Sequence, residues 1–302
     1  MLREAGELAL NLYHQAGSGP CVLYVHGATF PSALSVAYRL NGESWADNLQ
    51  SRGFDVWSFD FPGYGGSDRP AAMGKVSSRP NEVPGRANDA AHQIERVVRH
   101  IRSQTACTRT SIIAHSWGTI PAARFAGDHP EWVDRLVLFG PVAQRDRTAR
   151  DIAPTAASRS VSTADQWRSF QTGVPGGEAS PISKSDFEVW AKAYLGTDPT
   201  SGERSPPTVR VPAGPDVDFD EAWNGHLPFD PSIVRASTLI VRGEWDAITR
   251  DADAAWLVHA MVNVPGGAQD LKLARGAHRM HLEANRQELF DAVGEFLAQV
   301  RP

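Results

Sequence analysis

Ser116 lies where an apolar, strand-like run at 111–113 gives way to a helix-like stretch. The residues two positions to either side, Ala114 and Gly118, are both small. A serine at such a sharp strand-to-helix turn is typical of a nucleophile elbow, in which a strained backbone exposes the hydroxyl. The amide N–H groups that follow then point to the place where negative charge develops during acyl transfer. The short pattern alone also fits a serine that caps a helix. The choice between a nucleophile and a capping residue therefore depends on the rest of the chain.

A serine hydroxyl is a weak nucleophile at neutral pH and needs a base, which in turn needs an orienting carboxylate. Such partners are expected at the carboxyl ends of later strands, because open α/β sheets build their sites at that edge. Asp246 follows the strand-like run 238–241, and His278 follows the run 271–273. We therefore predict Ser116 as the nucleophile, His278 as the base and Asp246 as the orienting carboxylate.

Three nearby side chains compete for these roles. Glu244 could orient the base, but it lies too near the end of its strand to reach over the turn. His281 could act as the base, but it is expected to begin the final helix rather than to lie in the loop. His115 is adjacent to the nucleophile, and a neighbour in an elbow points away from it. All three are therefore ranked below the residues predicted above.

Acyl transfer also needs two N–H donors about 3 Å from the developing oxyanion. The backbone N–H of Trp117 immediately follows the nucleophile, and the loop after the first buried strand can supply the second donor. Gly27 allows this loop to curl toward the site, and Ala28 is the predicted donor. Thr29 is an alternative whose hydroxyl would add a third donor. His26 is predicted to brace the loop by hydrogen bonding rather than to transfer protons.

The composition limits the classes of partner. The chain has 30 basic and 35 acidic residues among 302, a formal net charge of −5, which gives no cationic field for nucleic acid or an anionic membrane. The first residues lack the pattern of a secretion signal, and no stretch approaches 18 apolar residues. We therefore expect a cytoplasmic monomer or homodimer that acts on a small-molecule substrate, without nucleic-acid or membrane partners.

Cysteine and histidine usage predicts neither a disulfide framework nor a metal site. The two cysteines, Cys21 and Cys107, both precede apolar strands, which would allow a bridge, but two reduced and partly buried thiols are the expected state in a cytoplasmic protein. The ten histidines are scattered, and His278 and His281 lack the carboxylate partner of an HExxH-type pair. We expect no metal and no cofactor.

Apolar runs of strand length alternate with longer helix-like patterns, which predicts an α/β fold with a mostly parallel central sheet and helices on both faces. Strands are expected at 8–13, 22–25, 56–59, 110–114, 136–139, 238–241 and 271–273. The helices of this core are expected at 44–49, 86–102, 119–127 and 289–297.

The segment 143–232 breaks this rhythm, because it is rich in proline, contains no strand-like run and concentrates aromatic residues. Short helices are expected at 165–170, 187–194 and 219–223. A disordered linker would not carry so many large apolar rings. We therefore predict a helical cap inserted into a core formed by residues 1–142 and 233–302. The predicted substrate contacts are Thr29, Phe30, Trp190, Trp223 and Trp245.

Five segments together resemble the α/β-hydrolase fold superfamily, and they keep that family's order: 26–27, 60–68, 115–118, 243–246 and 276–278. The resemblance covers the predicted core and not the cap. It implies a Ser116-Asp246-His278 triad, in the chain order of α/β-hydrolases, and an oxyanion hole formed by Ala28 and Trp117. Ala114 stands where glycine is usual, and the Gly-Gly-Gly or Gly-Pro-Gly runs of some lipases, C–C hydrolases and proline iminopeptidases are absent, which disfavours those subfamilies.

The residue type at position 116 selects the reaction class. Epoxide hydrolases and haloalkane dehalogenases of this fold use an aspartate there, whereas a serine would form a stable ether. Hydrolysis of a small carboxylic ester, lactone or thioester is therefore expected. A proline iminopeptidase-like aminopeptidase is one alternative, and a non-catalytic ligand-binding protein is another. The aminopeptidase needs cap carboxylates, although a solvated, helix-capping run is their simpler interpretation: Asp216, Asp218, Asp220 and Glu221.

Overall fold

The computed structural model describes residues 1–75, 79, 82–146 and 156–299. These residues contain a seven-stranded sheet with the strand order β1-β3-β2-β4-β5-β8-β9. β1 runs antiparallel to β3, and all other neighbours in this sheet are parallel. The strands are β1 (Asn11–Gln15), β2 (Cys21–Val25), β3 (Asp55–Asp60), β4 (Thr110–His115), β5 (Val133–Phe139), β8 (Ser237–Gly243) and β9 (Gln269–Leu273).

The predicted mostly parallel sheet is confirmed. Every residue of β2, β3 and β4 is buried, as strands covered on both faces require, and this burial explains their continuous apolar runs. The first strand begins later than the predicted 8–13, because Leu10 pairs instead with Leu2 in an isolated bridge. The apolar runs therefore locate buried strands well and a partly buried edge strand less well.

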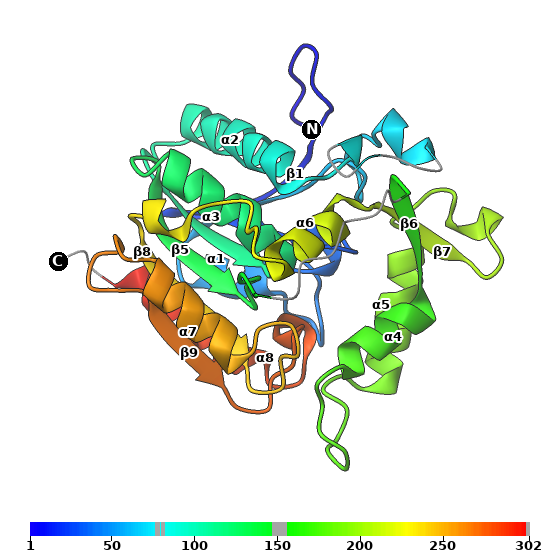
Figure 1. The fold of residues 1–302 in the computed structure, drawn as a ribbon. Helices are drawn as coiled ribbons and strands as arrows, with labels where there is room; N and C mark the ends of the chain where they lie inside the picture. The colour runs from blue at the N-terminus through cyan, green and yellow to red at the C-terminus, as the bar shows by residue number, and fades with distance from the viewer. Residues whose placement is uncertain (76–78, 80–81, 147–155, 300–302) are drawn as a thin grey trace.

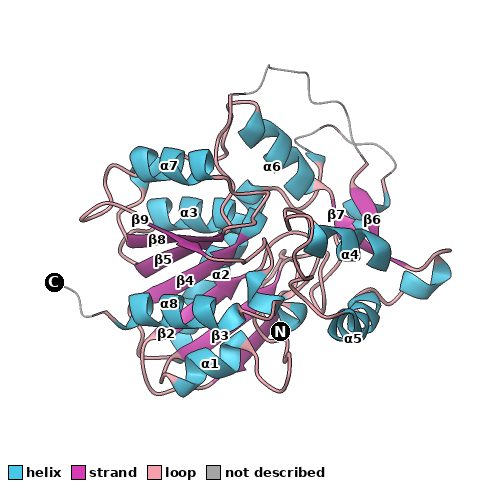
Figure 2. Cartoon of the chain, turned by 90° about the horizontal axis from the view of Figure 1, so that it is seen from below, coloured by secondary structure: helices cyan, strands magenta, loops and turns pink. Residues whose placement is uncertain are grey.

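Helices cover both faces of the sheet. α3 (Thr119–Asp128) and α7 (Asp251–Ala260) lie on one face, and α1 (Trp45–Ser51) and α8 (Arg286–Ala298) lie on the other (Figure 2). α2 (Ala87–Gln104) packs beside α3 and buries the apolar stripe that the sequence predicts. α7 is not among the predicted helices, because its apolar residues do not form a clear stripe.

The chain between β5 and β8 contains the three expected helices and, in addition, two strands. α4, α5, β6 and β7 gather at one side of the central sheet (Figure 1). The prediction that no strand occurs in this segment is wrong, because β6 and β7 form an antiparallel pair. In β7, Val209 and Val211 are buried and Arg210 is exposed, an alternation that the sequence does display. The elements are β6 (Ser158–Ser162), α4 (Thr163–Gln171), α5 (Lys184–Leu195), β7 (Thr208–Pro212) and α6 (Gly214–Trp223).

The aromatic residues of this segment form a packed cluster rather than a linker. Trp190 is fully buried, stacks on Tyr194 and packs edge-on against Phe170. Its indole N–H donates to the carbonyl of Leu34, 3.1 Å away, which attaches α5 to the loop after β2. The division into a core and a cap at 143–232 stays a prediction, and part of it, residues 147–155, lies outside the described residues.

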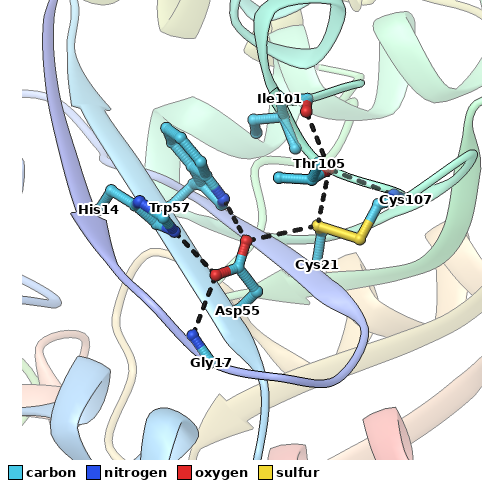
Figure 3. The surroundings of a disulfide bond; sticks show 8 residues. All are labelled: His14, Gly17, Cys21, Asp55, Trp57, Ile101, Thr105 and Cys107. Atoms are coloured by element: carbon cyan, nitrogen blue, oxygen red, sulfur yellow. Dashed lines mark hydrogen bonds and ion pairs between the residues drawn. A yellow bond between two sulfur atoms is a disulfide. The ribbon is translucent and has the colours of Figure 1, made fainter. Parts of the chain in front are cut away.

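A disulfide joins Cys21, at the start of β2, to Cys107, just before β4 (Figure 3). The expectation of two reduced thiols is therefore wrong. β2 and β4 are adjacent and parallel, so their amino ends meet, and the two Cα atoms lie 6.1 Å apart, within the usual range for a disulfide. Disulfides persist mainly in oxidising compartments, so this bond weighs against the cytoplasmic location, which stays a prediction. None of the helices in the described part of the chain is long and apolar enough to span a membrane.

We expect the double variant Cys21→Ser/Cys107→Ser to be less stable than the wild type by about 4 kcal/mol, because a cross-link across 86 residues of chain no longer restricts the unfolded state. Urea unfolding with and without reductant measures this effect. Reductant should lower the midpoint of the wild type and leave the double variant unchanged. Equal wild-type midpoints in both conditions would contradict a stabilising bond.

Candidate active site

Ser116 follows β4 in a short turn that leads into α3. Its φ of +55° lies in the left-handed region, which residues other than glycine rarely adopt and which is often found at functional sites. Two glycines permit a close approach of neighbouring backbone. A Cβ atom on Gly118 would collide with the carbonyl oxygen of His26, and one on Gly27 would lie 2.9 Å from Cβ of Ser116. The turn at Ser116 and the loop after β2 are therefore in direct contact.

A chain of hydrogen bonds joins the three side chains predicted to react. Nε2 of His278 lies 2.8 Å from Oγ of Ser116, and Nδ1 lies 3.0 and 2.9 Å from Oδ1 and Oδ2 of Asp246. Oδ1 of Asp246 also accepts the backbone N–H groups of Ile248 and Thr249, at 2.8 and 3.0 Å. All three side chains are buried. The structure thus brings together three residues that follow β4, β8 and β9, and an imidazole protonated on Nδ1 can accept the serine proton on Nε2.

Gly140, directly after β5, makes room for this arrangement. Its φ is +56°, and a Cβ atom there would lie 3.0 Å from Oδ2 of Asp246 and 3.0 Å from Nδ1 of His278. In the sequence, Gly140 directly follows the apolar run 136–139, which by itself indicates only where the strand ends. The strand order carries the missing information, because β5 lies between β4 and β8, so the residue after β5 must lie next to the groups that follow its neighbours.

The three competing side chains form hydrogen bonds elsewhere. Nε2 of His115 donates to the backbone carbonyl of His278 at 2.9 Å, and burial holds the pKa of His115 well below its usual value, so this ring is neutral. His281 lies 3.2 Å from the hydroxyl of Ser35, and burial likewise lowers its pKa. Glu244 is exposed and accepts a backbone N–H. His115 therefore helps to fix the backbone of His278.

The loop after β2 is braced as predicted. Nδ1 of His26 donates to the carbonyl of Gly27 at 2.7 Å, and Nε2 accepts the backbone N–H of Phe61 at 2.9 Å. Burial lowers the pKa of His26 and keeps the ring neutral, and these two partners place its proton on Nδ1. Thr29, in the same loop, has a φ of +83°. The loop is thus a fixed and locally strained structure beside Ser116, while the donor roles of Ala28 and Trp117 stay predictions.

The comparison with known proteins agrees with this architecture. A family model described as alpha/beta hydrolase fold matches residues 20–172, just over half of the chain. The chain belongs to the α/β-hydrolase fold family. The predicted membership is confirmed, and with it the expectation of a hydrolase.

Three solved structures illustrate the likeness of this α/β-hydrolase to others of the same fold. The thioesterase domain from the curacin biosynthetic pathway is 16% identical, with a TM-score of 0.65 and 98% of each chain covered. A meta-cleavage product hydrolase from Pseudomonas fluorescens is 16% identical, with a TM-score of 0.65, covering 96% of this chain and 94% of that one. An esterase from Exiguobacterium antarcticum is 16% identical, with a TM-score of 0.61, covering 98% and 97%. At these identities the likeness concerns the fold alone.

A cavity of about 260 Å³ lies against Ser116 and His278 of the hydrolase. The segment between β5 and β8, the loop after β2 and the loop after β9 all contribute to its wall, which includes Ala28, Thr29, Arg159, Ser169, Phe219 and Arg279.

The five predicted substrate contacts do not all line this cavity. Thr29 lines this cavity, whereas Phe30, Trp190, Trp223 and Trp245 lie outside its wall. Phe30 and Trp190 pack edge-on against each other, Trp223 packs against an arginine, and Trp245 lines a separate hollow. Phe30 and Trp190 thus belong to the packed interior, and the assignment of the five residues as substrate contacts stays a prediction. Arg279, which the sequence analysis did not consider, directly follows His278, so its position next to the predicted base was the available signal.

α6 carries the four acids considered for a substrate amino group: Asp216, Asp218, Asp220 and Glu221. None of them lines the cavity. Asp218 is fully buried and accepts the indole N–H of Trp117 and the backbone N–H of Ala87, both at 2.8 Å. Burial raises the pKa of Asp218 to about 6. The interpretation of these acids as a solvated run is therefore wrong for Asp218, which connects α6 to the turn at Ser116 and to the start of α2.

Glu283 is buried and contacts the loop that carries His278. Its Oε2 accepts the backbone N–H of Ala277 at 2.8 Å, and its Oε1 has no hydrogen-bond partner among the described residues. Burial raises the pKa of Glu283 to about 7, although the Arg279 guanidinium opposes part of this effect.

The raised pKa of Glu283 makes stability depend on pH. The folded protein keeps a proton that the unfolded chain releases above about pH 4.5, so this contribution to stability is lost as the pH rises through about 7. Glu283→Gln, which stays neutral, should therefore gain stability relative to the wild type between about pH 5 and pH 8, by up to roughly 3 kcal/mol. Urea unfolding of both proteins at the two pH values measures this. A difference in unfolding free energy between the two proteins that is the same at both pH values would contradict the prediction.

Proposed function

We propose that this α/β-hydrolase cleaves a small carboxylic ester, lactone or thioester through an acyl-enzyme formed on Ser116. The observation that carries this proposal is the hydrogen-bonded chain from Ser116 through His278 to Asp246 at the wall of the cavity. His278 takes the hydroxyl proton as Oγ attacks the carbonyl carbon, and the amides of Ala28 and Trp117 stabilise the oxyanion. His278 then protonates the leaving group, and water hydrolyses the acyl-enzyme in a second round of the same proton transfers.

The aminopeptidase alternative needs a carboxylate that faces the substrate's amino group. Asp216 instead pairs with Arg159, with 2.6 Å between the nitrogen and the oxygen, while Asp218 and Glu221 both pair with Arg86. The described wall of the cavity contains no aspartate or glutamate. This wall favours an ester, lactone or thioester over a substrate with a free amino terminus.

A non-catalytic ligand-binding protein is the other alternative. Backbone strain of the kind found at Ser116 costs on the order of 1–3 kcal/mol and persists mainly where function needs it. A binding pocket alone does not need a strained serine hydrogen-bonded to an oriented histidine. The arrangement at Ser116 therefore favours an enzyme.

Steady-state kinetics with 4-nitrophenyl esters and with proline 4-nitroanilide tests the proposal. We expect ester turnover, with kcat/KM for the prolyl amide lower by at least about 100-fold, because the described residues of the cavity wall include no carboxylate to pair with the amino group. A prolyl amide cleaved as well as the esters would favour the aminopeptidase. No turnover of any ester would favour the binding protein.

A further inference from the structure

Two guanidinium groups and no carboxylate line the described wall of the cavity beside Ser116. We propose that the substrate carries a free carboxylate, and that Arg279 binds it while the ester or thioester bond lies at Ser116. The inference rests on the proposed function for the reaction and adds the chemical class of the substrate and the residue that selects it.

Arg279 is held in one place by its surroundings. It is 8% exposed, and its Cζ lies 5.8 Å from the ring centre of Phe30 and 5.2 Å from that of Phe170. Its Nη1 donates to the backbone carbonyl of Ser169 in α4, 2.9 Å away. A guanidinium fixed by two rings and a carbonyl presents its remaining N–H groups in a set direction, which lowers the entropy cost of binding a planar anion.

The charge of Arg279 lacks a partner within the described part of the chain. No carboxylate there lies within 4.0 Å of its guanidinium, and its buried Nε has no hydrogen-bond acceptor among those residues. Asp246 and Glu283 affect the charge of Arg279 only by longer-range electrostatic attraction. Asp246 is hydrogen-bonded to His278 instead, and Glu283 to a backbone N–H. A buried charge without a counterion is costly, and a bound anion removes that cost.

The second guanidinium, that of Arg159, differs because it has a carboxylate counterion. Its Nε lies 2.6 Å from Oδ2 of Asp216, and 38% of its side chain is exposed. Among the described residues of the wall, one guanidinium is thus paired with a carboxylate and one is not. This balance matches a carboxylate, with a single negative charge, better than a phosphate dianion, although arginine can bind both.

A pair of substrates matched in length tests the proposal: mono-(4-nitrophenyl) adipate, which has a terminal carboxylate, and 4-nitrophenyl hexanoate, which has none. In the wild type we expect kcat/KM to be at least about tenfold higher for the adipate, as a charge-assisted hydrogen bond provides. Arg279→Gln should abolish this preference, and Arg279→Lys, which keeps the charge but not the fork, should retain part of it. A merely structural role of Arg279 would lower both rates together and leave their ratio unchanged, which would overturn the proposal.

Arg159→Gln is the matched control. It removes an arginine that lines the same cavity but is already paired with a carboxylate, that of Asp216. We expect it to change the preference less than Arg279→Gln does. An equal or larger loss in Arg159→Gln would overturn the assignment to Arg279.

Calorimetry on Ser116→Ala separates this inference from the proposed reaction, because it requires no turnover. Monomethyl adipate should bind this variant, and Arg279→Gln in the same background should weaken binding by at least about tenfold. Absence of binding, binding unaffected by Arg279→Gln, or tighter binding of inorganic phosphate would overturn the inference. If neither nitrophenyl ester is hydrolysed while monomethyl adipate still binds through Arg279, the proposed function falls and the carboxylate site stands. If both esters are hydrolysed with equal kcat/KM, the proposed function stands and the carboxylate site falls.

Discussion

Replacing Ser116 by alanine is expected to lower kcat for ester hydrolysis by on the order of 10⁵- to 10⁶-fold, because the acyl-enzyme can no longer form. The residual rate should exceed that in water, since the cavity and the backbone donors are unchanged. The fold should persist, because the side-chain hydrogen bond of Ser116 is made to His278 and the backbone conformation is equally strained for alanine. Initial rates with a 4-nitrophenyl ester, together with the thermal midpoint, measure both effects.

Ser111 provides the matched control for this variant. It is buried in the same strand, β4, but lies near the opposite end from the turn. Ser111→Ala should retain kcat within about threefold, because substitutions away from the reacting groups do not alter transition-state binding. Equal activity of Ser116→Ala and the wild type would remove Ser116 from the mechanism.

Asp246→Asn has the second largest expected effect, a loss of roughly 10⁴-fold in kcat. The geometry gives the reason. The backbone N–H groups of Ile248 and Thr249 both donate to Oδ1, so the oxygen of the new amide should stay there and its NH₂ group should replace Oδ2. That NH₂ group would face Nδ1 of His278, 2.9 Å from Oδ2 in the wild type. The imidazole would then carry its proton on Nε2 and could not accept the proton of Ser116.

Glu244→Gln tests whether Asp246, rather than Glu244, is the carboxylate that orients His278. Glu244 lies two residues away in the same turn, but it is exposed and bonded to a backbone N–H. We expect kcat within about threefold of the wild type, since this carboxylate does not touch the imidazole. A loss in Glu244→Gln as large as that in Asp246→Asn would show that the wrong carboxylate is assigned.

The central sheet and the meeting of Ser116, Asp246 and His278 could be predicted because both follow from local patterns. Parallel strands buried on both faces need continuous apolar runs, and parallel strands in one sheet end at a common edge. The side chain that follows each run is therefore a candidate for the same site. No knowledge of the strand order was needed for this prediction.

Features that depend on which strands are neighbours could not be read in the same way. The disulfide requires that β2 lies next to β4, and the role of Gly140 requires that β5 lies between β4 and β8. The lining of the cavity depends on tertiary packing as well. Trp190 stacks on Tyr194 and is fully buried, which removes apolar surface from water, and the sequence does not show which aromatic side chains pack in this way.

The central claim is that Ser116 is the nucleophile activated by His278, and covalent labelling tests it most directly. The protein is treated with a fluorophosphonate, digested and sequenced by mass spectrometry. We expect one phosphonylated peptide, which contains Ser116, and much slower labelling in Asp246→Asn, whose imidazole cannot accept the serine proton. A label on another residue, or no label on protein that hydrolyses esters, would contradict the account.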